Sequence, residues 1–320
     1  MKSRTTMVHR HRRPSHSPHK AGAAAAGWEN AIARLQGAYS PHTLRSYRTD
    51  FRSFLNWCAA HDQVPLPTTP LIIASYLAAE TARLKPSTLK RKLAGIRKVH
   101  RLLDHRDPTD HVEVDLALRR ARRLKPQRPK QALGITASLR DRLMAACGTD
   151  LTGLRDRALL AVGFDTLCRR GEIVALRAED LEPNHFGALS ILVRRAKNDP
   201  EGTGRIAHLS VPTVQVVEAW LSAAKITAGP LFRPIYCNIP IDRHLSPMTV
   251  TRVLKKLAAG ARFDALTVAK ISGHSLRVGA AQQLVMNGVQ LLPIMRAGGW
   301  RSMNIVARYI ENVDVNVWGR

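Results

Sequence analysis

The second half of the chain contains side chains whose types could act on an anion. His274 and Arg277 follow Ser272 at a spacing of one helical turn, and Tyr309 lies near the end of the sequence. An imidazole can accept a proton, a guanidinium can hold an anion through two hydrogen bonds, and a phenol can attack once it is deprotonated. We predict that Ser272 caps a helix carrying His274 and Arg277 on one face, a spacing that is more common among surface and capping residues.

Three more residues could join them, although each has an ordinary structural explanation when taken alone. Arg169 lies near a predicted helix junction, where arginine is common. Lys197 lies at the tip of a predicted hairpin, where a solvated lysine is the default. Trp300 follows Gly298-Gly299 and could simply anchor a core. Taken singly, these residues identify no site.

Their order along the chain, however, resembles the tyrosine recombinase (phage integrase) family in three motifs. In the first motif an arginine precedes a glutamate by three residues, the second is His-x-x-Arg, and in the third a His or Trp precedes the tyrosine by nine. The matching segments are Thr166–Leu176 with Arg169 and Glu172, Ser272–Ala281 with His274 and Arg277, and Gly298–Tyr309 with Trp300 and Tyr309. The similarity runs from about Ser40 to Tyr309, and a chance match of the whole ordered set is remote.

The resemblance implies that Tyr309 opens a phosphodiester by in-line attack. This attack builds negative charge on the nonbridging phosphate oxygens, and two guanidiniums can clamp those oxygens while staying charged at any working pH. The resemblance assigns that task to Arg169 and Arg277. A free phenol has a pKa near ~10, so Tyr309 needs a positive field or a nearby base, for which His274 is the candidate.

The resemblance also implies the roles of three supporting residues. Lys197 would protonate the departing 5′-hydroxyl, because desolvation and neighbouring cations, here Arg194 and Arg195, lower the pKa of a lysine. Trp300 would donate its indole N–H to a phosphate oxygen. Glu172 would orient a cation, although a plain surface carboxylate explains it nearly as well.

The bulk composition points to a polyanionic partner. Fifty Lys and Arg residues against twenty-four Asp and Glu give a net charge of +26, which attracts nucleic acid. Charge alone also fits a ribosome-like or other basic RNA-binding protein. We expect no metal and no cofactor, because the sequence has neither an acidic cluster suited to Mg²⁺ nor a Gly-x-x-x-x-Gly-Lys-Ser/Thr loop. The cysteines lack the spacing of a zinc site or a disulfide framework and indicate reduced thiols in a cytosolic protein; they are Cys58, Cys147, Cys168 and Cys237.

Two predicted domains must position these residues. Residues 1–27 predict a disordered basic arm, for which an organellar transit peptide is a minor alternative, and no apolar run approaches the ~20 residues of a membrane span. Residues 28–124 predict a helical core DNA-binding domain and residues 136–320 the catalytic domain. The segment between them, 125–135, is rich in Arg, Lys and Pro, which is typical of a linker.

The first domain shows four helical patterns with a basic outer face. Helices are predicted from Pro41 after a capping Ser40, over 70–84, from Pro86, and over 112–123. Lys92 is also assigned to the outer face. The residues expected to contact DNA are Arg45, Arg48, Lys90, Arg91, Arg97, Lys98 and Arg101.

The second domain is predicted to be mixed. Helices over 139–147 and 154–164 precede strands over 188–195 and 205–211, and helices dominate again from Val214. The fold class is therefore mainly α, with a small β-sheet or hairpin in the catalytic domain. The resemblance implies a SAM-like N-terminal bundle that forms a C-shaped clamp with the catalytic domain around DNA.

The function that this resemblance implies is site-specific DNA recombination through a 3′-phosphotyrosine intermediate and a Holliday junction. The expected partners are double-stranded DNA at specific recombination sites and a homo-tetramer on paired sites, with a monomer or weak association off DNA and no membrane. The expected location is cytoplasmic and nucleoid-associated. The alternatives are a type IB topoisomerase-like enzyme and a non-catalytic DNA-binding regulator. Only eleven residues follow Tyr309, so the interface between protomers could use a short tail anchored by Trp318 or another surface.

Overall fold

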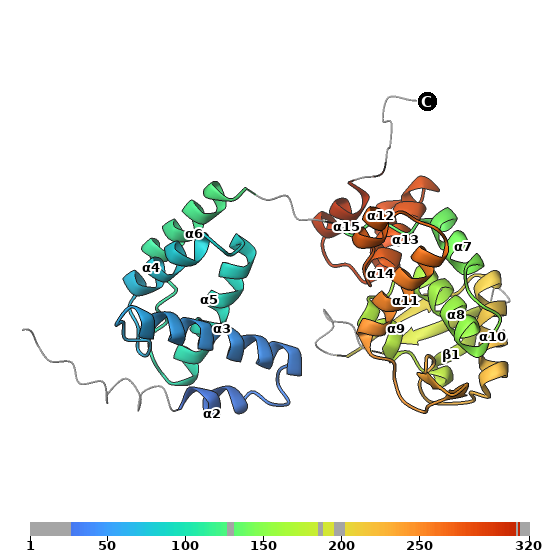
Figure 1. Cartoon of the computed structure of the whole chain (residues 1–320), viewed down its shortest axis with the longest axis horizontal. Helices are drawn as coiled ribbons and strands as arrows, with labels where there is room; N and C mark the ends of the chain where they lie inside the picture. The colour runs from blue at the N-terminus through green and yellow to red at the C-terminus, as the bar shows by residue number, and fades with distance from the viewer. Residues whose placement is uncertain (1–26, 127–130, 185–187, 195–201, 312, 314–320) are drawn as a thin grey trace, which may run out of the picture. The chain divides into compact units, whose positions relative to one another are not determined.

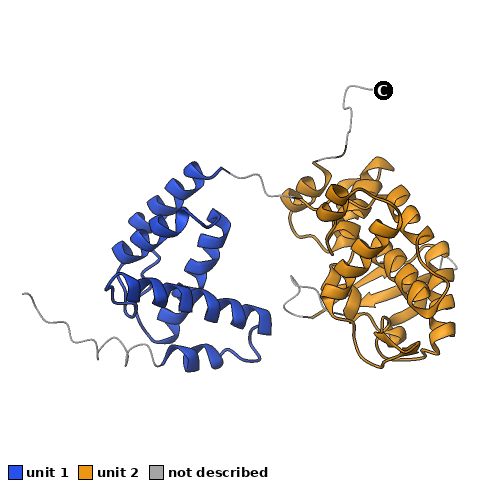
Figure 2. Cartoon of the chain, viewed as in Figure 1, with its two compact units in different colours: residues 1–129 blue, residues 130–320 orange. Residues whose placement is uncertain are grey.

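The computed structural model describes residues 27–126, 131–184, 188–194, 202–311 and 313. The chain divides into two compact units, residues 1–129 and 130–320, and each is described by itself (Figure 2). The predicted basic arm lies outside the described residues except for Gly27. Residues 131–135, which the sequence assigned to the linker, belong to the second unit, where Ile135 is buried.

The N-terminal unit is a bundle of helices (Figure 1). Aromatic side chains form much of its core. Ser40 caps the longest helix by accepting a hydrogen bond from the backbone N–H of Thr43, as predicted. Phe54 lies 6.2 Å from Phe51 and 5.1 Å from Tyr76 between ring centroids, and all three are fully buried. The helices are α2 (Trp28–Ala33), α3 (Pro41–Ala60), α4 (Pro70–Thr81), α5 (Pro86–Leu102) and α6 (Val112–Leu124).

One cation of this unit contradicts the prediction. Lys92, assigned to the outer face, is only 6% exposed, and its Nζ donates a hydrogen bond to Ser53 Oγ at 2.6 Å. The Glu80 carboxylate lies 4.0 Å away. Burial lowers the pKa of Lys92, and the nearby carboxylates of Glu80 and Asp50 oppose that shift. Lys92 therefore joins α3, α4 and α5 inside the unit and is not presented to a ligand.

In the C-terminal unit, helix α8 (Leu151–Asp165) packs against helices on several sides, and a small sheet belongs to the same unit (Figure 1). The second half of α8, residues 158–164, is apolar on all sides, as expected of a central helix, whereas its first half buries the ion pair of Arg155 and Asp156. The helices are α7 (Ala137–Ala145), α8 (Leu151–Asp165), α9 (Arg170–Ala175), η1 (Ala178–Asp180), α10 (Val211–Ala224), α11 (Pro247–Gly260), α12 (Ala265–Lys270), α13 (Ser275–Met286), α14 (Leu291–Gly298) and α15 (Met303–Ile310).

The two predicted strands are present and pair in antiparallel fashion. β2 (Leu189–Val193) and β3 (Arg205–His208) pair in a register that places Val193 opposite Arg205. β3 ends earlier than predicted because Ser210, whose backbone N–H and hydroxyl bind Asp165, precedes helix α10. Three short strands were not predicted, because their residues show no clear alternation of apolar and polar side chains. They are β1 (Leu181–Pro183), which pairs with β2, and the hairpin of β4 (Ile235–Tyr236) and β5 (Ile239–Pro240). None of the described helices is long and apolar enough to cross a membrane.

Candidate active site

The motif residues come from four segments of the C-terminal unit. Arg169 precedes helix α9, Trp300 lies between α14 and α15, and Tyr309 lies in the last turn of α15. The prediction that Ser272 caps the helix is wrong in detail. α13 begins at Ser275 with His274 at the N-cap position, and Ser272 Oγ accepts a hydrogen bond from the His274 backbone N–H at 3.1 Å. Ser272 thus shapes the turn that presents the imidazole.

The imidazole of His274 contacts the phenol of Tyr309. The His274 Nε2 and Tyr309 Oη atoms are 2.5 Å apart, although the two residues are separated by 35 positions in the sequence. Burial lowers the pKa of His274 to about 4, and the positive charges of Arg277 and Arg169 add to this shift. The ring is therefore neutral near pH 7, and a neutral ring nitrogen can accept the phenolic proton.

Arg277 is a fully buried cation with unused hydrogen-bond donors. Its NH1 donates to the carbonyl of Leu167, whereas its Nε and NH2 have no partner within the described residues. Burial and the nearby charge of Arg169 lower the pKa of Arg277 to about 10, so the group stays charged at neutral pH. Leu167 has a φ of 51°, a left-handed conformation that is costly for a residue with a β-carbon and that recurs at functional sites. A buried guanidinium with two free donors is suited to an oxyanion.

Glu172 binds the other motif arginine. Its Oε1 accepts from Arg169 NH1 at 2.6 Å, and its Oε2 accepts from the Arg169 backbone N–H at 3.0 Å. Glu172 is 5% exposed, so its interpretation as a plain surface carboxylate is wrong. The two hydrogen bonds fix both the start of α9 and the direction of the Arg169 guanidinium. Orientation of Arg169 by Glu172 is the role expected from the sequence.

Trp300 supplies another buried donor. The indole is 5% exposed, and its Nε1 has no partner within the described part of the chain. Its ring centroid lies 4.0 Å from the Arg277 guanidinium and 5.5 Å from the Tyr309 ring. A β-carbon on Gly298 would come within 2.0 Å of the indole, so only glycine lets the ring fold back at this position.

Sequence reasoning missed Arg205, which joins several of these segments. Its NH2 donates to the Thr166 carbonyl at 2.8 Å and to Cys168 Sγ at 3.2 Å, and its NH1 donates to the Ala297 carbonyl at 2.7 Å. The Glu172 carboxylate is 3.9 Å away. Arg205 thereby connects the turn that precedes Arg169 to the last turn of α14, which precedes Trp300. Its only sequence signal is an arginine at the start of a predicted strand, which is too common to be informative.

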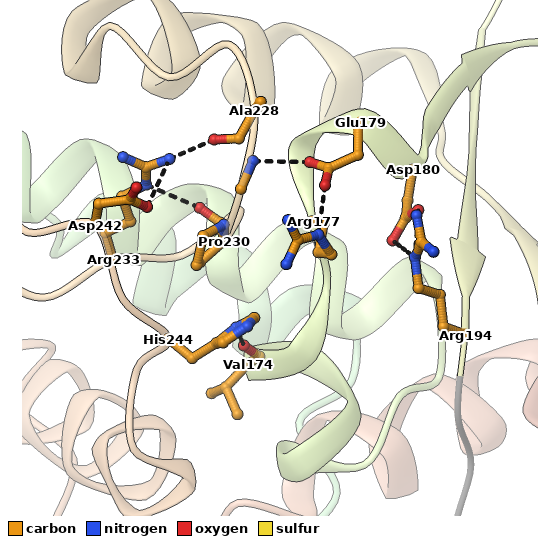
Figure 3. A network of polar contacts seen from close by, with 11 residues as sticks. Val174, Arg177, Glu179, Asp180, Arg194, Ala228, Pro230, Arg233, Asp242 and His244 are labelled. Carbon is orange, nitrogen blue, oxygen red and sulfur yellow. Dashed lines mark hydrogen bonds and ion pairs between the residues drawn. The ribbon is translucent and has the colours of Figure 1, made fainter.

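Lys197 lies outside the described residues, as does Arg195, so the predicted general acid has no described position. Arg194, at the end of β2, binds the buried Asp180 with its Nε at 2.8 Å and 3.0 Å from the two carboxylate oxygens. Figure 3 shows this pair beside two other ion pairs, Arg177 with Glu179 and Arg233 with Asp242. Arg194 therefore connects the end of β2 to η1 through this ion pair.

The predicted DNA-contacting residues lie on α3 and α5 and differ in their surroundings. Arg45 and Lys90 are exposed, and Arg48 is half-buried. Lys98 donates to Tyr39 Oη at 2.9 Å. The remaining three are exposed arginines that pair with carboxylates: Arg91 with Asp50, and Arg97 and Arg101 with Asp107. The carboxylates of these pairs are largely buried, with Asp50 1% and Asp107 12% exposed, so the three guanidiniums are held at the surface by acids that face inward.

In the part of the chain that the structure describes, no three His, Cys, Asp or Glu side chains are placed to hold a metal ion. The described site instead consists of a phenol on a neutral imidazole, two guanidiniums, a carboxylate and an indole N–H. A nucleophile beside a base, with donors for an oxyanion, can serve a transesterification at a phosphate.

Comparison with known proteins identifies the same two units. Residues 135–315 match the model of the phage integrase family, and residues 28–107 match the phage integrase N-terminal SAM-like domain. The chain is 30% identical to "Recombinase cre" of Escherichia phage P1 over 299 residues, which cover 88% of this chain and 87% of that protein. It is 31% identical to an integrase/recombinase XerD homolog of Selenomonas ruminantium over 301 residues, covering 88% and 85%.

Solved structures share the fold. A lambda integrase dimer bound to a COC′ core site matches with a TM-score of 0.60 at 14% identity, covering 93% of this chain and 98% of that one. The XerH recombinase bound to its difH substrate matches with a TM-score of 0.61 at 14% identity, covering 83% and 75%. The mainly helical fold with small antiparallel sheets, predicted from the sequence, is confirmed. The chain belongs to the phage integrase family and is a tyrosine recombinase.

Proposed function

We propose that this protein breaks and rejoins DNA strands at specific sites, with Tyr309 as the nucleophile that becomes linked to a 3′-phosphate. The observation that carries the proposal is the 2.5 Å contact between the Tyr309 hydroxyl and the neutral ring of His274. Beside this contact lies a buried Arg277 guanidinium with two unpartnered nitrogens among the described residues. A phosphodiester placed there would meet a nucleophile, a base and a cation together.

A bound phosphate would also make the His274 imidazole a stronger base. The pKa of His274 is depressed by burial and by the charges of Arg277 and Arg169. A phosphodiester anion on those guanidiniums offsets their charge and favours protonation of the imidazole. His274 is then able to take the phenolic proton when the substrate is in place. Negative charge that builds on the phosphate would be held by Arg169, Arg277 and the indole N–H of Trp300.

The departing 5′-oxygen needs a proton, and we assign that role to Lys197. The phosphotyrosine bond retains the energy of the broken phosphodiester, so attack by a 5′-hydroxyl on this bond rejoins the strand without ATP. Glu172 acts through Arg169 and holds it in the orientation that the phosphate requires.

We propose double-stranded DNA as the partner of both the helical domain of residues 28–124 and the catalytic domain of residues 136–320. The net charge of +26 and the cations on α3 and α5 support this partner. The matched lambda integrase and XerH structures are DNA complexes. We further propose a homo-tetramer on paired sites that exchanges strands through a Holliday junction, weak association off DNA, and action on the nucleoid in the cytoplasm.

Covalent capture tests this function on a mixture of candidate target sequences. A pool of nicked duplexes with randomised cores is incubated with the protein, and the DNA that stays attached in denaturant is sequenced. We expect adducts with the wild type and none with Tyr309→Phe, which should still bind DNA. Tyr236→Phe is the matched control, because Tyr236 lies 73% exposed on strand β4 and should leave adduct formation intact. An adduct that persists in Tyr309→Phe would overturn the assignment.

The captured sequence is then placed on two duplexes. Exchange of strands between the two supports recombination, whereas relaxation of supercoils without exchange would instead support a topoisomerase-like activity. DNA binding with no adduct in the wild type would support a non-catalytic regulator.

A further inference from the structure

Helix α15, which carries the nucleophile, has little hydrophobic anchorage. Of its eight residues only Val306 is buried. Full burial of one such side chain contributes little against the freedom of a terminal helix. Besides the ring contacts of Tyr309 with Trp300 and His274, polar contacts must therefore help to position the phenol, since a small rotation of α15 would carry the hydroxyl away from His274.

Two side-chain amides hold the main chain of Tyr309. Gln131 Nε2 donates to the Tyr309 carbonyl at 2.9 Å, and Gln282 Nε2 donates to the same oxygen at 3.1 Å. This carbonyl lies in the last turn of α15, where helix carbonyls have no partner within the helix. The residue is thus held at both ends, at its carbonyl by the two amides and at its hydroxyl by His274.

Both donors are themselves fixed. Gln282 lies on α13, which begins immediately after His274, and is 9% exposed. Residues 131–135 run beside α13, with the Leu133 N–H bound to the Lys270 carbonyl and the Ile135 N–H bound to the Ser275 carbonyl. A β-carbon on Gly134 would come within 1.9 Å of Gln282 Oε1, so this segment fits closely against the second donor. The amides therefore stand on the same framework as His274 and Arg277.

We propose that Gln131 and Gln282 are positioning residues for the nucleophile, because together they clamp the carbonyl of Tyr309 and keep its phenol on His274. This proposal rests on Tyr309 being the nucleophile. Neither amide lies among the groups assigned to the phosphate, so the clamp serves the attack by tyrosine and not the activation of the phosphate.

The rate of cleavage of the captured DNA site measures how much each amide contributes to the attack by Tyr309. Loss of one neutral hydrogen bond corresponds to roughly a 3- to 10-fold lower rate, and we expect this for Gln131→Ala and Gln282→Ala singly. Because each donor can hold the carbonyl when the other is missing, the double variant should lose more than the product of the single effects. Gln283→Ala is the matched control, since that neighbouring glutamine contacts Ala137 and Asn287 instead and should cleave like the wild type.

A small exogenous nucleophile distinguishes positioning from damage to the fold. In a Tyr309→Phe background, hydrogen peroxide replaces the phenol as the attacking group. We expect the double Gln131→Ala, Gln282→Ala change to leave peroxide cleavage within about twofold, because the phosphate site is intact. An equal loss in the peroxide reaction would overturn the proposal, as would a double variant that cleaves with Tyr309 at the wild-type rate.

Two further measurements test the clamp independently of the peroxide reaction. Hydrogen exchange on the free protein should show faster exchange over residues 303–310 in the double variant, with α8 and α13 unchanged; unchanged exchange over 303–310 would count against the clamp. Gln131→Glu cannot donate when ionised but can when protonated, so its rate relative to wild type should rise as the pH falls through the carboxyl range. A wild type that forms no adduct refutes the proposed function, and the exchange experiment still judges the clamp.

Discussion

The substitution Gly298→Ala isolates the contribution of the Trp300 indole. A β-carbon built on Gly298 lies 2.0 Å from Cζ3 and 2.2 Å from Cε3 of Trp300. Carbon atoms pack at about 3.5–4.0 Å, so the ring must move by about 1.5 Å or more. That movement changes the position of the indole relative to the Arg277 guanidinium, now 4.0 Å from the ring centroid, and displaces its N–H, which has no partner among the described residues.

Two magnitudes follow for Gly298→Ala. Loss of one preorganised donor to a developing oxyanion costs about 10²–10³ in rate, so we expect covalent adduct formation to fall at least about 100-fold. Overpacking costs about 1–3 kcal/mol in the free energy of unfolding, which leaves the protein folded if its stability is ordinary. DNA affinity should change little because the indole is buried and the cations expected to bind DNA lie on α3 and α5.

The assay is single-turnover adduct formation on a nicked duplex carrying the captured site, resolved on a denaturing gel. Gly260→Ala is the control, because nothing lies within 4 Å of a β-carbon at that position among the described residues. Trp300→Phe, which keeps an aromatic ring but has no N–H, should show a loss of similar size. Cleavage by Gly298→Ala within about threefold of the wild type would refute the reasoning that the placement of the indole matters.

Three other changes test the surrounding contacts. Glu172→Gln weakens a charged hydrogen bond worth about 1.5–3 kcal/mol, so adduct formation should fall about 10-fold or more while DNA binding in a gel-shift assay is retained. The folded-state pKa of His274 is depressed from 6.5 to about 4, so wild-type stability should be complete above pH 6.5 and fall by up to about 3 kcal/mol as the pH drops towards 4. Denaturant titrations of His274→Gln should lack this component; an identical pH profile would refute the assignment. Arg205→Met leaves the carbonyls of Thr166 and Ala297 without their donor and should lower the free energy of unfolding by about 2–5 kcal/mol, measured by denaturation, whereas a wild-type midpoint would show that the bridge is dispensable.

Fixed spacing made part of the site predictable. His274 and Arg277 lie in one turn of chain, and only a short turn separates Trp300 from the start of α15, so local sequence already constrained their neighbourhood. The helix starts at Ser40 and Pro86 were predictable for the same reason, because capping and proline act within a few residues.

Contacts between distant segments were not predictable in this way. Arg205 meets Thr166 and Ala297 only because the fold brings the start of β3 near the ends of α8 and α14, and nothing near Arg205 in the sequence signals those partners. Lys92 is buried because its ammonium contacts Ser53 on α3 and Glu80 on α4. The spacing of apolar residues along α5 cannot reveal these contacts. Strand β1 has three residues and no alternation, so it exists as a strand only through its pairing with β2.

The short segment 131–135 has a practical consequence for how this protein can be divided or recombined with its relatives. An excised catalytic fragment that starts at α7 would contain every motif residue yet lack Gln131 and the backbone bonds of Leu133 and Ile135. In a chimaera joined at Ala137, the segment equivalent to residues 131–135 would come from one protein and the helix that carries the tyrosine from the other. A fragment or chimaera that keeps the contacts of Tyr309 must therefore be joined before Gln131, several residues upstream of α7.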